Sequence, residues 1–278
     1  AGKSGTPSTE VAGTAFNVTV NCVDNYYNIA TTGVTQPEVR ITTSDTFDSE
    51  PAATVLTNST KTFSVNLVTV GTAIITATDT GNAGGTSYLP DVSPNISVGP
   101  GTMVKLQLLL PGEGAVAGSG TGKTGTPTVA TAGTTFTVTV NSVDANWNKV
   151  SSTEQVRVYT SDLNDTDPNA LFLSGGTKTF NITLQTASIT TLTAVDVGGA
   201  GLTQNISPNV TVNPNSATKL QVLVPGETAV PGKTTGTPGK TGTPSAETSG
   251  TAFTITVNCI DNWYNKVSTA NPNITTTT

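Results

Sequence analysis

Short stretches in which apolar residues alternate with Thr or Asn recur along this chain. The clearest is FTVTVN from Phe136, and no stretch has apolar residues at the 3.6-residue spacing of a helix. Between residues 117 and 224 the pattern predicts strands at 135–144, 155–160, 170–173, 177–184, 188–196, 205–213 and 219–224. About seven short strands in roughly 100 residues predict an antiparallel β-sandwich with Greek-key connections. Its core should form around Phe136, Val138, Val140, Phe180, Ile182 and Leu192.

One long motif occurs three times. It reads GKSGTPSTEVAGTAFNVTVNCVDNYYN from Gly2, GKTGTPTVATAGTTFTVTVNSVDANWN from Gly122 and GKTGTPSAETSGTAFTITVNCIDNWYN from Gly239. This spacing is that of a whole domain, much longer than the roughly 20–50 residues of a solenoid repeat. We therefore expect tandem sandwich domains joined by Gly-, Pro- and Thr-rich linkers. The predicted parts are a first repeat at 1–100, a strand plus linker at 101–126, a second repeat at 127–214, a strand plus linker at 215–244, and a partial third repeat at 245–278.

The third copy stops at Thr278, near the position equivalent to Val158. A third of a β-domain exposes strand edges and an uncovered apolar face, so it should not be stable alone. Three interpretations stay open. The chain is a window on a longer tandem array, which we favour; the rest of the domain exists outside this sequence; or strands of a neighbouring chain complete it by β-augmentation.

The segment AGTTFTVTVNSVDANWN and its two counterparts resemble bacterial Ig-like tandem repeats, such as those of surface adhesins, invasin-type stalks and extracellular fibrils. The shared features are a small residue before Gly, an alternating strand, Val-Asp and a turn that contains Asn. The resemblance covers both full copies and the partial third. It implies an exported, Ig-like, mechanical or adhesive array that is extracellular or at the cell surface. Many such repeats have Gly-Asn after the Asp, whereas this chain has Tyr27-Asn28, Trp147-Asn148 and Tyr264-Asn265.

Charged residues make up only 11% of the chain, the net charge is −6, and His is absent. Nucleic-acid-binding domains usually carry clustered Lys and Arg, so we expect no nucleic-acid partner. No apolar run approaches the roughly 20 residues of a membrane span. A surface so poor in charge needs another source of solubility, and dense Ser, Thr and Pro is typical of O-glycosylated stalks. We therefore expect covalent glycans.

Asn-linked sequons supply further glycosylation candidates. They are Asn17, Asn58, Asn95, Asn164, Asn181, Asn205, Asn209 and Asn273.

The two cysteines, Cys22 and Cys259, occupy the same position in the first and third copies, so no repeat can hold an internal disulfide. Because Cys22 continues the period-two series of the preceding strand, we expect it to face the core.

The turn after each long strand is the best candidate for a binding site. It reads DNYYN from Asp24, DANWN from Asp144 and DNWYN from Asp261. Oxygen ligands at alternating positions would suit Ca²⁺, with Asp45, Asp79, Asp162 and Asp196 as further contributors, but each turn brings a single carboxylate. We therefore favour no metal, and interpret the turn as one in which Asp and Asn bond local backbone. The aromatic residue Tyr27, Trp147 or Tyr264 would stack on a sugar ring, cover the end of the sandwich, or contact another repeat.

Catalysis has little support, because without His the chain has no Ser-His or Cys-His pair. We expect no catalytic residues, no enzyme activity and no cofactor. The first hypothesis is a glycosylated structural repeat protein, forming the core of an extracellular fibril or cell-surface stalk, whose partner is itself as a homopolymer or tandem array. The second is an adhesin segment that binds glycan or a host surface through the aromatic turns. A third is a spacer array of a secreted enzyme.

Overall fold

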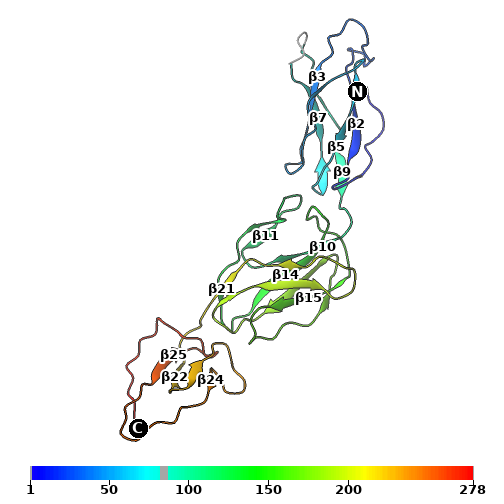
Figure 1. Cartoon of the computed structure of the whole chain (residues 1–278). Coiled ribbons are helices and arrows are strands. Elements are labelled where there is room, and N and C mark those ends of the chain that lie inside the picture. Colours follow the sequence, from blue (N-terminus) through cyan, green and yellow to red (C-terminus); the bar gives the residue numbers. More distant parts are fainter. Residues whose placement is uncertain (1, 82–86, 278) are drawn as a thin grey trace. The chain divides into compact units, whose positions relative to one another are not determined.

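The structure is a computed structural model that describes residues 2–81 and 87–277 (Figure 1). All regular elements in these two ranges are β-strands, and this part of the chain contains no helix able to cross a membrane. By internal contacts the chain divides into two compact units. The first comprises Ala1–Lys105, Ala115–Thr124 and Ser142–Ser151, and the second comprises Leu106–Gly114, Gly125–Asn141 and Ser152–Thr278. The five parts predicted from the repeats have other limits than these two units. Those predicted limits stay a prediction.

The first repeat contains the first nine strands. They are β1 Glu10–Val11, β2 Phe16–Asn21, β3 Glu38–Thr43, β4 Thr54–Val55, β5 Thr60–Val65, β6 Gly71–Ala73, β7 Ile75–Asp79, β8 Asp91–Val92 and β9 Ile96–Gly99. One sheet has the order β4-β3-β7-β8, a second has the order β1-β9-β6, and β2 pairs with β5. The pairs are antiparallel except for β1 and β9, which run parallel.

The second repeat has the same order of strands. They are β13 Ala130–Thr131, β14 Phe136–Val143, β15 Gln155–Thr160, β16 Leu171–Phe172, β17 Thr177–Ile182, β18 Ile189–Thr190, β19 Leu192–Asp196, β20 Asn205–Ile206 and β21 Val210–Asn213, with β10 Lys105–Leu109 before them. The sheets are β16-β15-β19-β20, β13-β21-β18 and β10-β14-β17. Pairing of β14 with β17 and of β15 with β19 is the pairing of B with E and of C with F in the Ig fold. The predicted class, all-β with tandem Ig-like sandwiches, is confirmed.

The alternating pattern places the predicted core correctly. Phe136 lies opposite Ile182, as Phe16 lies opposite Val65 in the first repeat. Five predicted core residues are at most 2% exposed, namely Val138, Val140, Phe180, Ile182 and Leu192, and Phe136 is half-buried. Thr137 between them is exposed, because successive strand residues face opposite sides of a sheet.

Two predicted strands are each broken in the structure. The stretch 188–196 divides at Thr191, because β18 pairs with β21 in one sheet and β19 pairs with β15 in another. The stretch 205–213 divides at Ser207 and Pro208, where Pro has no N–H for a ladder. Ser207 Oγ fills the gap, accepting the Leu192 N–H at 2.9 Å and donating to the Pro208 carbonyl at 2.8 Å.

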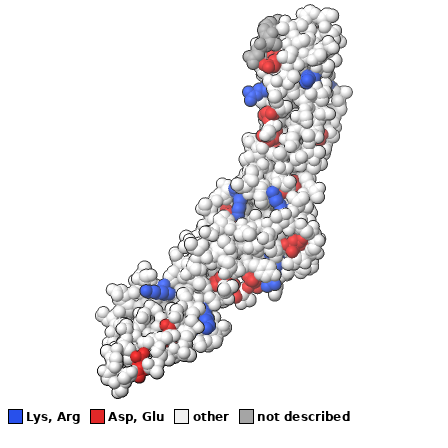
Figure 2. All heavy atoms as spheres, in the orientation of Figure 1, with Lys and Arg blue, Asp and Glu red and all other residues white. Residues whose placement is uncertain are grey.

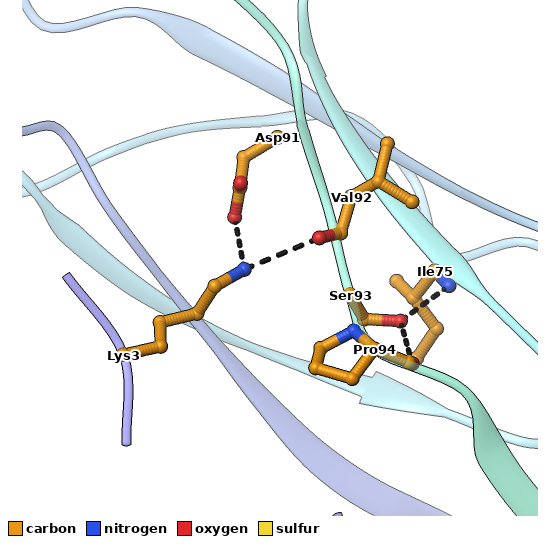
Figure 3. Close-up of polar contacts among 6 residues, drawn as sticks. All are labelled: Lys3, Ile75, Asp91, Val92, Ser93 and Pro94. Carbon is orange, nitrogen blue, oxygen red and sulfur yellow. Dashed lines mark hydrogen bonds and ion pairs between the residues drawn. The ribbon is translucent and has the colours of Figure 1, made fainter. Parts of the chain in front are cut away.

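A serine makes the same two hydrogen bonds in the first repeat (Figure 3). Ser93 Oγ accepts the Ile75 N–H at 2.9 Å and donates to the Pro94 carbonyl at 2.8 Å. Beside it, Lys3 Nζ donates to Asp91 Oδ2 at 2.6 Å and to the Val92 carbonyl at 3.2 Å, which ties the first residues to β8. The repeated SPN sequence is therefore a structural motif that joins neighbouring strands.

The linkers contain short strands, which their Gly and Pro content did not predict. β11 Glu113–Ala115 pairs with β12 Lys123–Gly125, and β23 Glu227–Ala229 pairs with β24 Lys240–Gly242. Glycine makes the second pair feasible, because a Cβ on Gly242 would lie 2.1 Å from the Gly226 carbonyl oxygen. Lys240 Nζ lies 2.7 Å from Glu227 Oε1, and this contact lowers the pKa of Glu227.

The partial third repeat exposes apolar surface, as predicted. Its strand β25 Thr256–Ile260 forms a two-stranded sheet with β22 Lys219–Leu223 of the preceding strand plus linker. Leu220 and Val222 are 54% and 46% exposed, whereas the equivalent Leu106 and Leu108 of β10 are 0% exposed. How this face is completed stays a prediction.

Candidate functional site

Three turns with the same geometry follow the long strands. We call Asp24–Asn28, Asp144–Asn148 and Asp261–Asn265 the Asp–Asn turns. In each, Asp Oδ1 accepts the main-chain N–H groups two and four residues later, at 2.8 and 2.9 Å in the first turn and 2.9 and 2.9 Å in the other two. The Asn side-chain nitrogen donates back to Asp Oδ2, at 3.0, 2.9 and 2.9 Å. The carboxylate thus holds the Asn amide in one orientation before any partner arrives.

The aromatic residue of each turn has a left-handed backbone. The φ angles of Tyr27, Trp147 and Tyr264 are 64°, 65° and 64°. Glycine takes this conformation without steric cost, whereas residues with a side chain adopt it only rarely. Here the ring packs against a glycine, since a Cβ on Gly122 would lie 2.2 Å from a ring atom of Trp147, and Gly239 is placed in the same way against Tyr264.

A lysine covers the ring in the second and third turns. Lys105 Nζ lies 3.6 Å from the centre of the Trp147 ring and donates to the Ala145 carbonyl at 2.7 Å. Lys219 Nζ lies 4.2 Å from the Tyr264 ring and donates to the Asn262 carbonyl at 3.0 Å. Burial lowers the pKa of Lys105. Sugar stacking on these aromatic residues stays a prediction. In the second and third turns a lysine already lies over the ring.

The turns differ in burial. Asp144 is 1% exposed, Asn148, Asp261 and Asn265 are 0% exposed, and Asp24 and Asn28 are exposed. In the two buried turns, further main-chain N–H groups reach the second carboxylate oxygen. Gly101 donates to Asp144 Oδ2 at 2.8 Å, and Asn215 donates to Asp261 Oδ2 at 2.9 Å.

The buried asparagines bind the main chain of a loop in the preceding repeat. Asn148 Oδ1 accepts the Val70 N–H at 2.9 Å, and its Nδ2 donates to the Val68 carbonyl at 2.9 Å. Asn265 makes the same pair of bonds with Ala187 and Gln185, both at 2.8 Å. We call 68–70 and 185–187 the receiving loops. Each amide joins the carbonyl of one residue and the N–H of the second residue after it, so it recognises backbone rather than side chains.

An aspartate shapes each receiving loop; Asp162 is buried and Asp45 is half-buried. Asp45 Oδ2 accepts the N–H groups of Val68 and Thr69 at 2.8 and 2.7 Å, and Thr69 Oγ1 donates to Asp45 Oδ1 at 2.7 Å. Asp162 makes the equivalent three bonds to 185–186 at 2.7, 2.7 and 2.6 Å. Burial raises the pKa of each aspartate, but the bonds from threonine and the backbone outweigh it and lower the pKa overall.

A linker glycine lies against the threonine of each receiving loop. A Cβ on Gly118 would lie 2.0 Å from Thr69 Oγ1, and a Cβ on Gly232 would lie 2.0 Å from Thr186 Oγ1. The same glycines donate N–H bonds to the Asp–Asn turns, Gly118 to the Asn146 carbonyl and Gly232 to the Trp263 carbonyl, both at 2.8 Å. Linker, turn and receiving loop therefore form one hydrogen-bonded cluster in each case.

A second acidic site lies beside the receiving loop of the second repeat. Thr160 Oγ1 donates to Asp165 Oδ2 at 2.8 Å, and the Thr160 N–H donates to Asp167 Oδ1 at 2.8 Å. Burial, with smaller contributions from Asp162 and Asp167, raises the pKa of Asp165 to about 6. The two carboxylates hold a loop through one threonine.

The sequons lie in different surroundings. Asn17, Asn58, Asn95, Asn181, Asn209 and Asn273 are exposed, and Asn164 and Asn205 are half-buried. Asn164 Nδ2, the atom that a glycan would modify, donates to Thr186 Oγ1 at 3.0 Å and to the Pro231 carbonyl at 3.1 Å. Glycosylation stays a prediction at every sequon, and the geometry disfavours Asn164.

Metal and cysteine chemistry have few candidate groups. Among residues 2–81 and 87–277 no group of three His, Cys, Asp or Glu side chains is placed to hold a metal ion. The interpretation favoured above, no metal, with Asp24, Asp144 and Asp261 as weak calcium candidates, stays a prediction. Both cysteines are free thiols; Cys22 is buried, as expected, and Cys259 is half-buried.

Charged side chains are sparse and scattered over the face shown in Figure 2.

Comparison with known proteins gives structural matches only. No family model matches the sequence, and no curated protein matches it. Among solved structures, domains 4–9 of the surface-layer protein SbsC are 16% identical with a TM-score of 0.27, covering 89% of this chain and 31% of that one. The D0-D1 domain of intimin is 14% identical with a TM-score of 0.29, covering 74% and 94%. The BSP domain of a biofilm-associated protein is 12% identical with a TM-score of 0.24, covering 77% and 30%.

These matches include a surface-layer protein and a biofilm-associated protein. The chain spans about a third of the length of the SbsC structure that it matches. With TM-scores this low, the fold assignment depends on the strand pairing described above. The functional argument depends on the Asp–Asn turns.

Proposed function

We propose that this chain is a structural repeat segment of an extracellular fibril or cell-surface stalk, in which the Asp–Asn turns couple successive repeats. The observation that carries the proposal is the recurrence of one contact. Asn148 and Asn265 each bond the backbone of the preceding repeat at two points, over the same sequence separations of 78 and 80 residues. A binding site for a foreign ligand has no reason to be buried in this way at successive repeats.

The mechanism is mechanical. Antiparallel ladders such as β14 with β17 resist extension within a repeat, and the buried Asp–Asn turn opposes separation of the turn from its receiving loop. Each coupling involves two hydrogen bonds inside a water-poor contact, each contributing about 1 kcal/mol net. Many weak couplings in series give length and spacing without reactive groups.

Covalent glycans fit this function, because exposed threonines and sequons such as Asn17 and Asn181 lie on the outer faces of strands. Sugar there would supply the solubility that a charge content of 11% does not.

Imaging of the native material tests the proposal. Electron microscopy of the surface of the source cells, with antibody against this chain, should show labelled filaments or stalks of regular subunit spacing. Label confined to dispersed, unpolymerised protein would contradict it.

An adhesin segment is the second candidate, favoured by the exposed aromatic pair of the first turn. Tyr26 is 85% exposed and Tyr27 is 52% exposed. Because Tyr26 packs against little, Tyr26→Ala should leave the fold intact. If the natural chain binds to a glycan array and Tyr26→Ala abolishes that binding, the adhesin function is supported over the purely structural one.

A further inference from the structure

We propose that the exposed first turn, Asp24–Asn28, is a docking surface for a further copy of this same repeat, whose receiving loop it binds through its backbone. The inference deepens the proposed function, on which it rests, by naming the partner and the atoms. Asn28 should bond the carbonyl and N–H of that loop, as Asn148 bonds Val68 and Val70.

The first turn already has the geometry of the other two. Asp24 Oδ1 accepts the Tyr26 and Asn28 N–H groups at 2.8 and 2.9 Å, and Asn28 Nδ2 lies 3.0 Å from Asp24 Oδ2. In the buried turns these distances agree within about 0.1 Å. The exposed turn is therefore preorganised, and binding would cost little ordering of its side chains.

The partner must be a copy of this repeat rather than an arbitrary strand. At both buried turns the loop is held by an aspartate and carries a central threonine, against which a linker glycine packs. The residues on either side of that threonine differ between the loops, so the Asn amide recognises only main-chain atoms. The aspartate, the threonine and the linker glycine around the loop supply the specificity. The ring of Tyr27 already packs against Gly2, as Trp147 packs against Gly122, so the linker side of the site is also formed.

The flanking linker would complete the site. In the second and third turns, a lysine from the segment before the turn covers the aromatic ring and donates to a turn carbonyl. A further repeat placed before Gly2, with its linker, would bring the counterpart of Lys105 to Tyr27 and to the Asn25 carbonyl.

The test uses the whole chain extended by one repeat. Residues 1–121 are placed before Gly2 of the full chain, which recreates the natural passage from Thr121 into a GK-x-GTP sequence. Residue-resolved hydrogen exchange is measured on the amide of the added copy's Val70, in the extended chain and in its Asn28→Ala variant. The proposal predicts that Asn28→Ala speeds this exchange about ten- to a hundredfold. The matched control is Asn25→Ala, because the second turn has Ala145 at that position, and it should change nothing.

An internal reference separates this inference from the proposed function. In the same molecule, Asn148→Ala should speed exchange at the natural Val70. If Asn148→Ala acts and Asn28→Ala does not, the docking proposal is overturned while the coupling of the internal repeats stands. If neither variant acts, the coupling itself is wrong. Folding of the added repeat is checked by slow exchange in its counterpart of β3 and β7.

Discussion

Replacement of Asn265 with alanine should weaken the contact between the third turn and the second repeat. The loss of stability should be far larger than that caused by Asn28→Ala in the natural chain. Asn265 is 0% exposed and makes two bonds of 2.8 Å to 185–187. Its nitrogen also lies 2.9 Å from Asp261 Oδ2. The two bonds contribute about 1 kcal/mol each, and the buried carboxylate that loses a donor costs about 1 kcal/mol more. The expected loss is therefore about 3 kcal/mol.

The assay is urea unfolding followed by tryptophan fluorescence. Trp263 lies in the third turn, with its ring against Gly133 of the second repeat, so its emission should change when the turn separates. Asn265→Ala should lower the midpoint of that transition by about 1–2 M, for a slope of about 2 kcal/mol per M. Asn28→Ala is the control, because Asn28 is exposed and water replaces its bonds. Equal shifts for the two variants would refute the reasoning.

Three further predictions concern charge, packing and modification. Asp165→Asn should raise stability at pH 7 by about 1 kcal/mol after allowance for solvent screening, measured by thermal unfolding at several pH values. The pKa of Asp165 in the fold, about 6, lies above its ordinary 3.8, so the natural chain should lose stability as the pH rises from 4 through 6. Gly232→Ala should destabilise the second unit by about 2–4 kcal/mol in urea, because its Cβ would strike Thr186 and its φ is +79°. Glycopeptide mapping of native material should find Asn164 unmodified.

Each of these has a defined contrary outcome. Unchanged pH dependence in Asp165→Asn would show that this carboxyl does not titrate with folding. The matched control for Gly232 is Gly236→Ala, at φ +70° with nothing within 4 Å of the new Cβ, which carries the backbone strain alone. Equal losses for the two glycine variants would remove the steric argument. A glycan on Asn164 would mean that its bonds to Thr186 and Pro231 do not persist.

The sequence predicted the strands and the core because period-two alternation is a local property. It failed where the cause was not local. The break at Thr191 arises because the chain passes from one sheet to another, and the linker strands arise because glycine lets two backbones approach.

The Asp–Asn turns were found from the sequence, but their partner was not. Asn148 binds backbone atoms 78 and 80 residues away, and backbone recognition leaves no side-chain signature in the loop. One signal was present, since Asp45 and Thr69 recur at the same 24-residue spacing as Asp162 and Thr186. Repetition alone could not show that this pair shapes a receiving loop.

Hydrogen exchange at the Val70 and Ala187 amides of the natural chain tests the central claim most directly. These N–H groups donate to Asn148 and Asn265, at 2.9 and 2.8 Å. The account predicts slow exchange at both, with Asn148→Ala releasing only Val70 and Asn265→Ala releasing only Ala187. Fast exchange at both amides in the natural chain, or no response to either variant, would contradict it.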